Sequence, residues 1–290
     1  DGKFPGRRKP TPEEPEGIRI AEREALQEHA DLMIATDPDS DRIGAGVICD
    51  SKAFFFTGNQ IGALLADFLS RQGSVKGKIM VTTVVTGDLG SRIVTSRGAT
   101  VIHTLTGSKF VCEDMNHMEA GEFLLGYEES HGYIGGMHIR DKDGVLAAML
   151  LCETAAWHKT QGKTLLDALE DLYQEYGYYI DEQDSFVFEG AKGAKEMQKI
   201  MARLRSRRGS VFAPLGKPDK MLDYEKGVDE LPRSNVLKFF FPNGSWVAVR
   251  PSGTEPKIKF YYCIRGKDQR QAEDLYEAVQ NSVEEFLRTF

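Results

Sequence analysis

The chain has 290 residues, of which 41% are apolar and 28% are charged, and its net charge is −7. This length allows two or three domains with a core in each, and the acidic balance argues against nucleic acid or an anionic membrane as the main partner. A local basic pocket can still hold a small anion such as phosphate. No apolar run approaches the length of a membrane helix, so we expect neither a membrane span nor a secretory signal. The few cysteines are scattered without a Cys-x-x-Cys pair, which favours reduced thiols and a cytoplasmic protein.

The first residues suggest a piece of a longer polypeptide. The chain begins at Asp1 without an initiator methionine, and a proline-rich loop follows over residues 9–16. We therefore expect the gene to encode further residues upstream.

The first predicted part, residues 1–53, is the C-terminal portion of an α/β domain. Apolar residues at helical spacing predict a surface helix over residues 16–30. Strands are expected over 31–36 and 43–49, on either side of an acidic loop.

In the second predicted part, residues 54–177, strands and helices alternate. This alternation is typical of a three-layer α/β domain with a parallel or mixed sheet. Its first helix carries apolar residues at core-facing spacing: Ile61, Leu64, Leu65, Phe68 and Leu69. The other expected elements are strands at 79–85, 100–104 and 123–125 and helices at 88–97, 144–158 and 165–176.

The third predicted part, residues 178–290, has closely spaced strands with helices at both ends. This order predicts an α+β domain with an antiparallel sheet. The expected strands are 185–188, 236–241, 245–249 and 257–264, and the expected helices are 194–208 and 271–287.

Carboxylates at alternate positions mark the loop Asp37-Pro38-Asp39-Ser40-Asp41-Arg42. On one side of an extended turn, like charges about 4 Å apart repel by roughly 4 kcal/mol per pair at an effective dielectric near 20. Mg²⁺ would relieve this repulsion, since it is usually held by a few carboxylates with phosphate or water in its other positions. The alternative is a solvated acidic turn. An EF-hand is excluded, because Arg42 and Ile48 stand where that motif needs glycine and glutamate.

A second loop, Arg250-Pro251-Ser252-Gly253-Thr254-Glu255-Pro256, lies between two predicted strands. Its hydroxyls, its glycine and its guanidinium are suited to cradling a phosphate group without a P-loop. Lys257 and Lys259 follow on one face of the next strand and add positive charge. A polar hairpin is equally consistent with these residue types.

A third loop is rich in glycine and carries the paired acceptors Glu128-Glu129-Ser130. Sugar hydroxyls are bound by acceptor sets of this kind, although an acidic surface loop is the more common explanation when the loop is considered alone. Downstream, residues 138–144 place cationic side chains before a helix that Asp143 can cap. We assign no independent catalytic role to His131 or His138.

Taken in the order in which they occur along the chain, residues 37–42, 128–130 and 250–256, the three loops resemble the α-D-phosphohexomutase family, and within it the phosphoglucomutases. The resemblance runs from end to end of the chain but covers only the last part of the family's four domains. We call residues 37–42 the metal loop, residues 128–130 the sugar loop and residues 250–256 the phosphate loop. The resemblance implies that the metal loop closes domain 2 (residues 1–53), that the sugar loop lies in domain 3 (54–177) and that the phosphate loop lies in domain 4 (178–290). The family's nucleophile is a phosphorylated serine in a Thr-Ala-Ser-His-Asn-Pro type loop of the first domain, and no stretch here matches that loop.

The resemblance also implies roles for individual residues. It implies Mg²⁺ as the cofactor, with Asp37, Asp39 and Asp41 as its ligands. Arg42 is implied to hold the reacting phosphate, and Lys142 is the implied acid/base. The residues implied in substrate binding are Thr106, Lys109, Glu128, Ser130, Arg250, Ser252, Gly253, Thr254 and Lys259. In the phosphomannomutase branch the sugar loop ends in Ser-Gly-His, whereas the order Ser130-His131-Gly132 favours the glucose branch.

The function implied is that of the C-terminal portion of an isomerase of carbohydrate metabolism, a phosphoglucomutase/phosphomannomutase. Such a phosphoprotein interconverts hexose 1-phosphate and hexose 6-phosphate through its phosphoserine and a 1,6-bisphosphate. The expected partners are glucose 1-phosphate, glucose 6-phosphate, glucose 1,6-bisphosphate and the missing N-terminal domain, with no nucleic acid and no membrane. Without the serine, we expect the chain alone to be inactive and the three loops to line one cleft.

Two other functions remain open. A non-catalytic sugar-phosphate-binding or regulatory protein would have the same loops and a start of its own. A Mg²⁺-dependent phosphatase would also use an acidic loop, but it would leave residues 250–254 unexplained.

Overall fold

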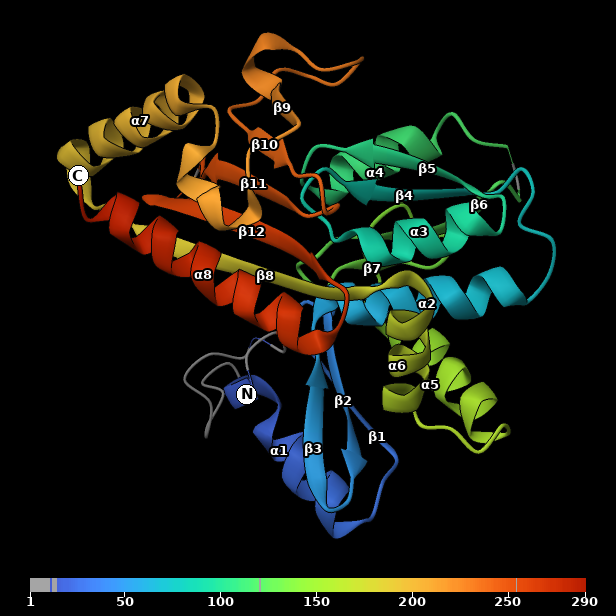
Figure 1. Ribbon diagram of the computed structural model, residues 1–290. Helices are drawn as coiled ribbons and strands as arrows, with labels where there is room; N and C mark the ends of the chain where they lie inside the picture. The colour runs from blue at the N-terminus through green and yellow to red at the C-terminus, as the bar shows by residue number, and fades with distance from the viewer. Residues whose placement is uncertain (1–10, 12–14, 120, 254) are drawn as a thin grey trace. The chain divides into compact units, whose positions relative to one another are not determined.

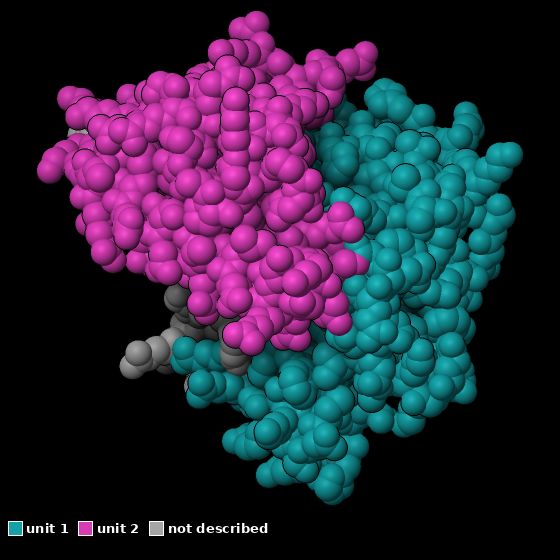
Figure 2. All heavy atoms as spheres, viewed as in Figure 1, with its two compact units in different colours: residues 1–176 teal, residues 177–290 magenta. Residues whose placement is uncertain are grey.

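The computed structural model describes residue 11 and residues 15–119, 121–253 and 255–290. The chain forms two compact units, residues 1–176 and 177–290, which have different colours in Figure 2. Most of the predicted proline-rich loop and Thr254 of the phosphate loop lie outside the described residues. Within the described ranges, we find no helix with the length and apolar content that crossing a membrane requires.

The first unit opens with an antiparallel sheet in the order β1-β2-β3 (Figure 1). These strands are β1 (Leu32–Thr36), β2 (Ile43–Cys49) and β3 (Lys52–Phe56). Helix α1 (Pro15–Gln27) packs on the sheet through Ile18 and Ala25, which form a small core with Met33. Because Thr36 pairs with Ile43, the acidic loop connects adjacent antiparallel strands. The predicted boundary between residues 53 and 54 falls inside β3, whose pairing with β2 groups residues 54–56 with this sheet.

The second sheet of this unit has the order β5-β4-β6-β7. Its strands are β4 (Ile79–Thr83), β5 (Thr100–Thr104), β6 (Phe123–Tyr127) and β7 (Tyr133–Ile134). The first three are parallel and β7 is antiparallel, so the sheet is mixed.

Helices cover both faces of this mixed sheet (Figure 1). Helices α2 (Gly58–Arg71) and α3 (Asp88–Ser96) lie on one face, and α4 (Ser108–Met115) lies on the other. Neighbouring residues of β6 illustrate the layers, because Gly126 faces Val111 of α4 whereas Tyr127 faces α2 and α3. The ring of Tyr127 fills the space that Cβ atoms on Gly62 and Gly90 would need, so glycine lets both helices approach the sheet closely.

A buried ion-pair cluster joins α2 to the end of α3. The carboxylate of Asp67, in α2, is only 2% exposed and accepts from Nε of Arg71 at 2.8 Å. Arg97, which follows α3, also forms an ion pair with Asp67 and donates from Nη1 to its backbone oxygen at 2.9 Å. Two guanidinium groups therefore compensate one buried negative charge.

Helices α5 (Gly144–Lys159) and α6 (Leu165–Tyr176) complete the described part of the first unit. The carboxylate of Asp143 caps α5 by accepting from the amide of Leu146 at 2.9 Å, the role that the sequence suggested. Helix α5 packs against both α2 and β1. It therefore links the mixed sheet to the sheet that carries the acidic loop.

The second unit is built on an antiparallel sheet in the order β8-β12-β11-β10-β9. Its strands are β8 (Tyr178–Val187), β9 (Lys220–Asp223), β10 (Leu237–Phe240), β11 (Trp246–Pro251) and β12 (Lys257–Gly266). Helices α7 (Gly190–Arg207) and α8 (Gln269–Leu287) share a core with alternate residues of the central strands, among them Phe239, Val247 and Phe260. Short 3₁₀ segments, η1 (Ser210–Leu215) and η2 (Tyr224–Lys226), flank β9.

The predicted fold class is confirmed in its three parts. A partial α/β region, a three-layer α/β region with a mixed sheet and an antiparallel α+β region follow one another along the chain. The prediction did not include β3, α4, β7 and β9, each of which has eight residues or fewer.

One buried histidine makes the stability of the first unit sensitive to acid. His158 of α5 is 6% exposed, and neither ring nitrogen has a hydrogen-bond partner among the described residues. Burial, together with the smaller effects of neighbouring charges, lowers the pKa of His158 below its ordinary value of 6.5. Below that ordinary value the unfolded chain binds a proton that the folded chain does not, so the free energy of unfolding falls as the pH drops.

We expect the His158→Leu variant to lose less stability than the unaltered chain between pH 7 and pH 5. Urea unfolding at several pH values measures this. The free energy of unfolding should fall less between pH 7 and pH 5 for the variant than for the unaltered chain. His117→Gln, at an exposed position, serves as the control. Parallel pH profiles for His158→Leu and the unaltered chain would contradict the prediction.

Candidate functional site

The acidic loop is a tight turn organised by its first carboxylate. Asp37 is 3% exposed, and its Oδ1 accepts from the backbone amides of Asp41 and Arg42, each at 3.1 Å. Its Oδ2 accepts from Nε of Arg42 at 2.8 Å. Ser40 has a φ of 57°, which lets the chain turn back within the loop. Asp37 therefore fixes the loop, while the carboxylate of Asp39 is exposed.

The third carboxylate of the loop lies between two cations. Oδ2 of Asp41 forms an ion pair with Nζ of Lys142, and Oδ1 of Asp41 lies 3.4 Å from Nε of Arg42. Burial disfavours the charged ammonium group of Lys142, but the hydrogen bond to Asp41 and the charges of Asp41 and Glu128 outweigh it. The pKa of Lys142 is therefore raised above its ordinary value.

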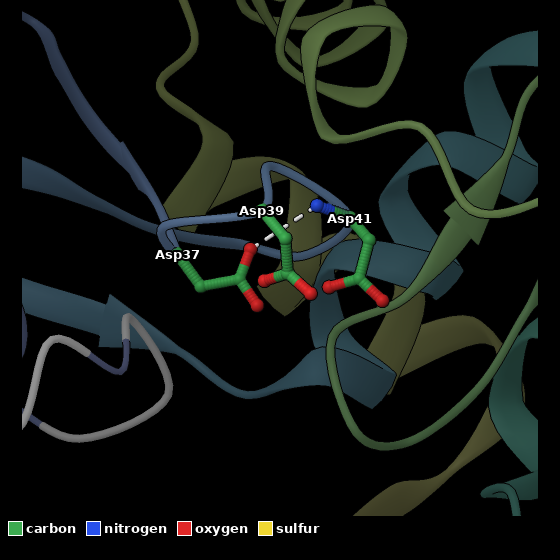
Figure 3. A group of neighbouring side chains, drawn as sticks. All are labelled: Asp37, Asp39 and Asp41. Carbon is green, nitrogen blue, oxygen red and sulfur yellow. Dashed lines mark hydrogen bonds between the residues drawn. The ribbon is translucent and has the colours of Figure 1, made fainter.

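The three carboxylates have the donor atoms and spacing for a hard divalent cation. One oxygen from each of Asp37, Asp39 and Asp41 lies within 4.8 Å of the others, and the three groups point to the same side of the loop (Figure 3). Ligand oxygens around Mg²⁺ are about 3 Å apart when adjacent and about 4.2 Å apart when opposite, so the three carboxylates would have to move closer together to share one ion. Oδ1 of Asp41 is buried and accepts no hydrogen bond from the described residues, and its charge is balanced by the guanidinium of Arg42, whose Nε lies 3.4 Å away. This oxygen therefore has the capacity to bind a further cation.

The predicted sugar loop follows β6, and its two glutamates lie in different surroundings. Glu128 is 7% exposed and accepts with Oε1 from the amide of Gly107 at 2.7 Å. It thereby holds the loop around Thr106, just before α4, against the sugar loop. Glu129 accepts with Oε2 from the hydroxyls of Thr83 and Thr86, at 3.2 and 3.1 Å. Both carboxylates thus brace neighbouring segments.

The remaining predicted sugar-loop residues are partly accessible. Ser130 and Thr106 are half-buried, and Lys109 in the first turn of α4 is exposed. The ammonium group of Lys109 lies 4.7 Å from the centre of the Phe110 ring. These side chains are therefore available to a ligand at the carboxyl end of the parallel strands, which is where open α/β sheets usually bind ligands.

Backbone contacts join the sugar loop directly to the metal loop. Arg42 and Gly132 form an antiparallel bridge, and the amide of Ile43 donates to the oxygen of His131 at 3.2 Å. On the other side, the amide of Gly144 donates to the oxygen of Ser40 at 2.9 Å. A Cβ on Gly144 would lie 2.7 Å from that oxygen, so only glycine allows the start of α5 to come this close.

The predicted phosphate loop lies in the second unit, between β11 and β12. Arg250 is the cross-strand partner of Lys259, so the two cationic side chains share the face of the sheet opposite the helices. Like charges at directly opposed positions are destabilising, which indicates a place for an anion. No ion pair joins Arg250 to another described residue, whereas Lys257 is paired with Glu255 at 2.6 Å.

The loop itself is closed by its own hydrogen bonds. The amide of Ser252 donates to the oxygen of Lys257 at 2.8 Å, and Oγ of Ser252 accepts from the amide of Glu255 at 3.2 Å. Gly253 is exposed, and a Cβ there would meet no described atom within 4 Å. Packing within the chain therefore gives no reason for glycine at this position, which is consistent with a need for free access from outside.

The structure brings together the predicted residues of the first unit: the metal loop, Lys142 and the sugar loop. The predicted residues of the phosphate loop are close to one another in the second unit, with Thr254 outside the described residues. A cleft shared by all three loops stays a prediction. Sequence reasoning missed the contacts of His131 and Gly144 with the metal loop, because contacts between distant segments leave no local pattern.

Fold and site together define a class of protein that combines an α/β region carrying a cluster of three carboxylates with an antiparallel domain carrying paired cationic side chains. Sequence models of one family match along the whole order. These are phosphoglucomutase/phosphomannomutase alpha/beta/alpha domain II at residues 1–49, domain III at residues 57–176, and the C-terminal domain at residues 187–282.

Curated relatives agree with these matches. The phosphoglucomutase of Staphylococcus haemolyticus is 34% identical over 299 residues, which cover 98% of this chain and 54% of the relative. That of Staphylococcus epidermidis is 34% identical over 248 residues, covering 81% and 45%. The chain thus spans about half the length of the curated relatives it matches.

Solved structures share the fold. The phosphoglucomutase parafusin from Paramecium has a TM-score of 0.71 at 23% identity, over 94% of this chain and 49% of that one. A phosphoglucomutase/phosphomannomutase family protein from Burkholderia thailandensis has a TM-score of 0.67 at 18% identity, over 98% and 52%.

The chain belongs to the phosphoglucomutase/phosphomannomutase family, the α-D-phosphohexomutases, and its curated relatives place it in the phosphoglucomutase branch. This confirms the family predicted from the three loops and makes the chain part of a family of mutases, enzymes of the isomerase class.

Proposed function

We propose that these residues form the metal-binding and substrate-binding portion of an enzyme that interconverts glucose 1-phosphate and glucose 6-phosphate. The phosphoryl group would pass through a phosphoserine outside these residues and a 1,6-bisphosphate. The observation that carries the proposal is the joined cluster of metal loop and sugar loop, in which three carboxylates, Arg42 and Lys142 converge.

The metal site is proposed to hold Mg²⁺ on Asp37, Asp39 and Asp41. When bound, the ion neutralises charge on the transferring phosphoryl group. Arg42 lies beside Asp37 and Asp41 and can offer its remaining N–H groups to phosphate oxygens. Lys142, in contact with Asp41, is the acid/base candidate for the sugar hydroxyl that gains or loses the phosphoryl group.

The proposed substrate contacts come from both units. Ser130 and Glu128 would orient the sugar hydroxyls, with Thr106 and Lys109 at the edge of the same loop cluster. Arg250, Ser252, Gly253, Thr254 and Lys259 would hold the phosphate that does not react. The binding energy of these contacts, away from the reacting atoms, would help to position the reacting end of the sugar.

The three parts predicted as residues 1–53, 54–177 and 178–290 are proposed as domains 2, 3 and 4 of the family, with the first boundary moved to the end of β3 because residues 54–56 pair with β2. The partner needed for turnover is the family's first domain, which carries the serine. A cytoplasmic location is proposed with the function, because sugar phosphates are cytoplasmic metabolites.

The experiment that tests the proposal is calorimetric titration of the 290-residue chain with glucose 1-phosphate in the presence of Mg²⁺. We expect a dissociation constant between about 10 μM and 1 mM, and weaker binding of unphosphorylated glucose. The Arg250→Ala variant should bind glucose 1-phosphate about tenfold or more weakly, since charged hydrogen bonds are lost. Arg270→Ala removes an exposed arginine of the same unit and is the matched control.

The outcomes separate the candidate functions. Absence of binding at 10 mM glucose 1-phosphate would contradict the proposal. Binding by the chain together with mutase activity of the complete gene product would support the enzyme. Binding without mutase activity of that product would favour the non-catalytic sugar-phosphate-binding or regulatory alternative. Turnover by the chain alone would contradict the assignment of the nucleophile to a serine elsewhere.

A further inference from the structure

His131 makes two hydrogen bonds to the one residue that follows the metal loop. Its backbone oxygen accepts from the amide of Ile43 at 3.2 Å, and its ring Nδ1 lies 3.0 Å from the oxygen of Ile43. A carbonyl oxygen can only accept, so Nδ1 carries the hydrogen and donates. The side chain is 8% exposed. The imidazole is therefore committed to the backbone at the C-terminal end of the metal loop.

The backbone of His131 is held in a conformation that favours this contact. Its φ is 66°, in the left-handed region, which is unfavourable for a non-glycine residue and persists where surrounding contacts compensate. Here the two hydrogen bonds to Ile43 and the adjacent bridge between Arg42 and Gly132 provide them.

The next residue, Gly132, gives a packing reason for the order His131-Gly132, in contrast to the Gly-His order of the phosphomannomutase branch. A Cβ on Gly132 would overlap the aliphatic stem of Lys142, whose ammonium group is held by Asp41. Glycine at this position lets Lys142 cross the sugar loop and reach the metal loop. The histidine one position earlier is directed to Ile43 and not to the place where Lys142 lies.

We propose that His131 is a positioning residue that fixes the metal loop for Mg²⁺ through its Nδ1–H bond to Ile43. The inference rests on the proposed metal site and adds a specific role for a residue to which the sequence gave no independent weight. Residues that orient metal-binding groups from behind commonly change metal affinity by 10-fold or more when they are replaced.

The test compares His131→Asn with His131→Gly in the 290-residue chain. Both asparagine and glycine tolerate a positive φ, but only asparagine has an N–H donor on the atom that corresponds to Nδ1. The probe is Mn²⁺ alone, titrated with detection by electron paramagnetic resonance. We expect the glycine variant to bind Mn²⁺ about 5- to 10-fold more weakly than the unaltered chain, and the asparagine variant to bind within about twofold of it.

Two controls separate positioning from general destabilisation. Thermal unfolding of each metal-free variant shows whether the fold is intact, and His158→Asn replaces the other buried histidine of the first unit, far from the metal loop in sequence. His158→Asn should leave the Mn²⁺ affinity unchanged. If His131→Gly does not fold, His131→Ala takes its place, since alanine has no donor and fits a positive φ better than a bulky side chain does.

Equal Mn²⁺ affinities for the unaltered chain and the glycine variant would overturn the inference and leave the proposed function standing. Equal losses in the asparagine and glycine variants would also overturn it, because the donor would then be irrelevant. If the unaltered chain binds no Mn²⁺ at millimolar concentration, the metal-site proposal fails and the inference fails with it.

Discussion

Replacement of Asp39 by asparagine is expected to weaken Mg²⁺ binding by about 100-fold without loss of stability in the metal-free chain. The change removes one full negative charge from the proposed ligand set while keeping the shape of the side chain. Asp39 is exposed and makes no hydrogen bond or ion pair with another described residue, so the loop does not depend on it. Calorimetry with Mg²⁺ and thermal unfolding of the metal-free protein measure the two effects.

Two further variants make this result specific. Asp50→Asn removes the same charge from the turn between β2 and β3, where Asp50 has a φ of 49° that asparagine tolerates, and should leave Mg²⁺ binding within about twofold. Asp37→Asn should weaken Mg²⁺ binding and also cost about 1–3 kcal/mol of stability, because the carboxylate that holds Arg42 is lost. Unchanged Mg²⁺ affinity in Asp39→Asn would refute the ligand assignment.

The largest effect on stability is expected at Asp67. Its replacement by alanine should lower the free energy of unfolding by about 3–5 kcal/mol, the cost of breaking a buried ion pair by removing one partner. Arg97 would then keep a mostly buried guanidinium without its carboxylate, at the junction of α2 and α3. Urea unfolding followed by circular dichroism gives the change in free energy.

Asp171→Ala provides the comparison for Asp67. It breaks the exposed ion pair of Asp171 with Lys163 and should cost less than about 1 kcal/mol. A loss at Asp67 as small as that at Asp171 would mean that the buried cluster contributes no more than a surface pair.

Local patterns in the sequence were enough to predict the helices with strong apolar periodicity. The predicted helix at residues 165–176 coincides with α6, and the strand at 43–49 coincides with β2. Helix α6 buries apolar residues at helical spacing, and β2 is a short continuous apolar run in which five successive residues are buried, so each has a local signal. Helix α4 buries only Val111 and Met115 over its two turns, which is too little for a periodic signal.

Pairing with a partner strand, and not local sequence, determined the elements that were predicted poorly. Strand β8 was expected only at residues 185–188, and the more polar residues before them were not included. In the structure it runs over Tyr178–Val187, because β12 pairs with it along its whole length. A partner strand thus extends a segment that its own residues do not favour.

In the candidate site too, features formed by neighbouring residues were predicted, whereas contacts between distant segments were not. The carboxylate spacing in residues 37–41 was enough to predict a compact acidic cluster, because those residues are neighbours in the chain. The approach of His131 and Gly144 to that cluster depends on where β6 ends and α5 begins, which only the folded chain determines.

The contact between Gly144 and Ser40 affects how the metal loop would bind a divalent ion. The amino end of α5, with its partial positive charge, abuts the turn from one side, while a guanidinium and an ammonium group balance its charge from the others. Contacts within the chain itself therefore hold the turn in place. At the proposed Mg²⁺ site, an ion would compete with the ammonium group of Lys142 for Asp41, and the carboxylates would only have to draw closer together, without refolding of the chain.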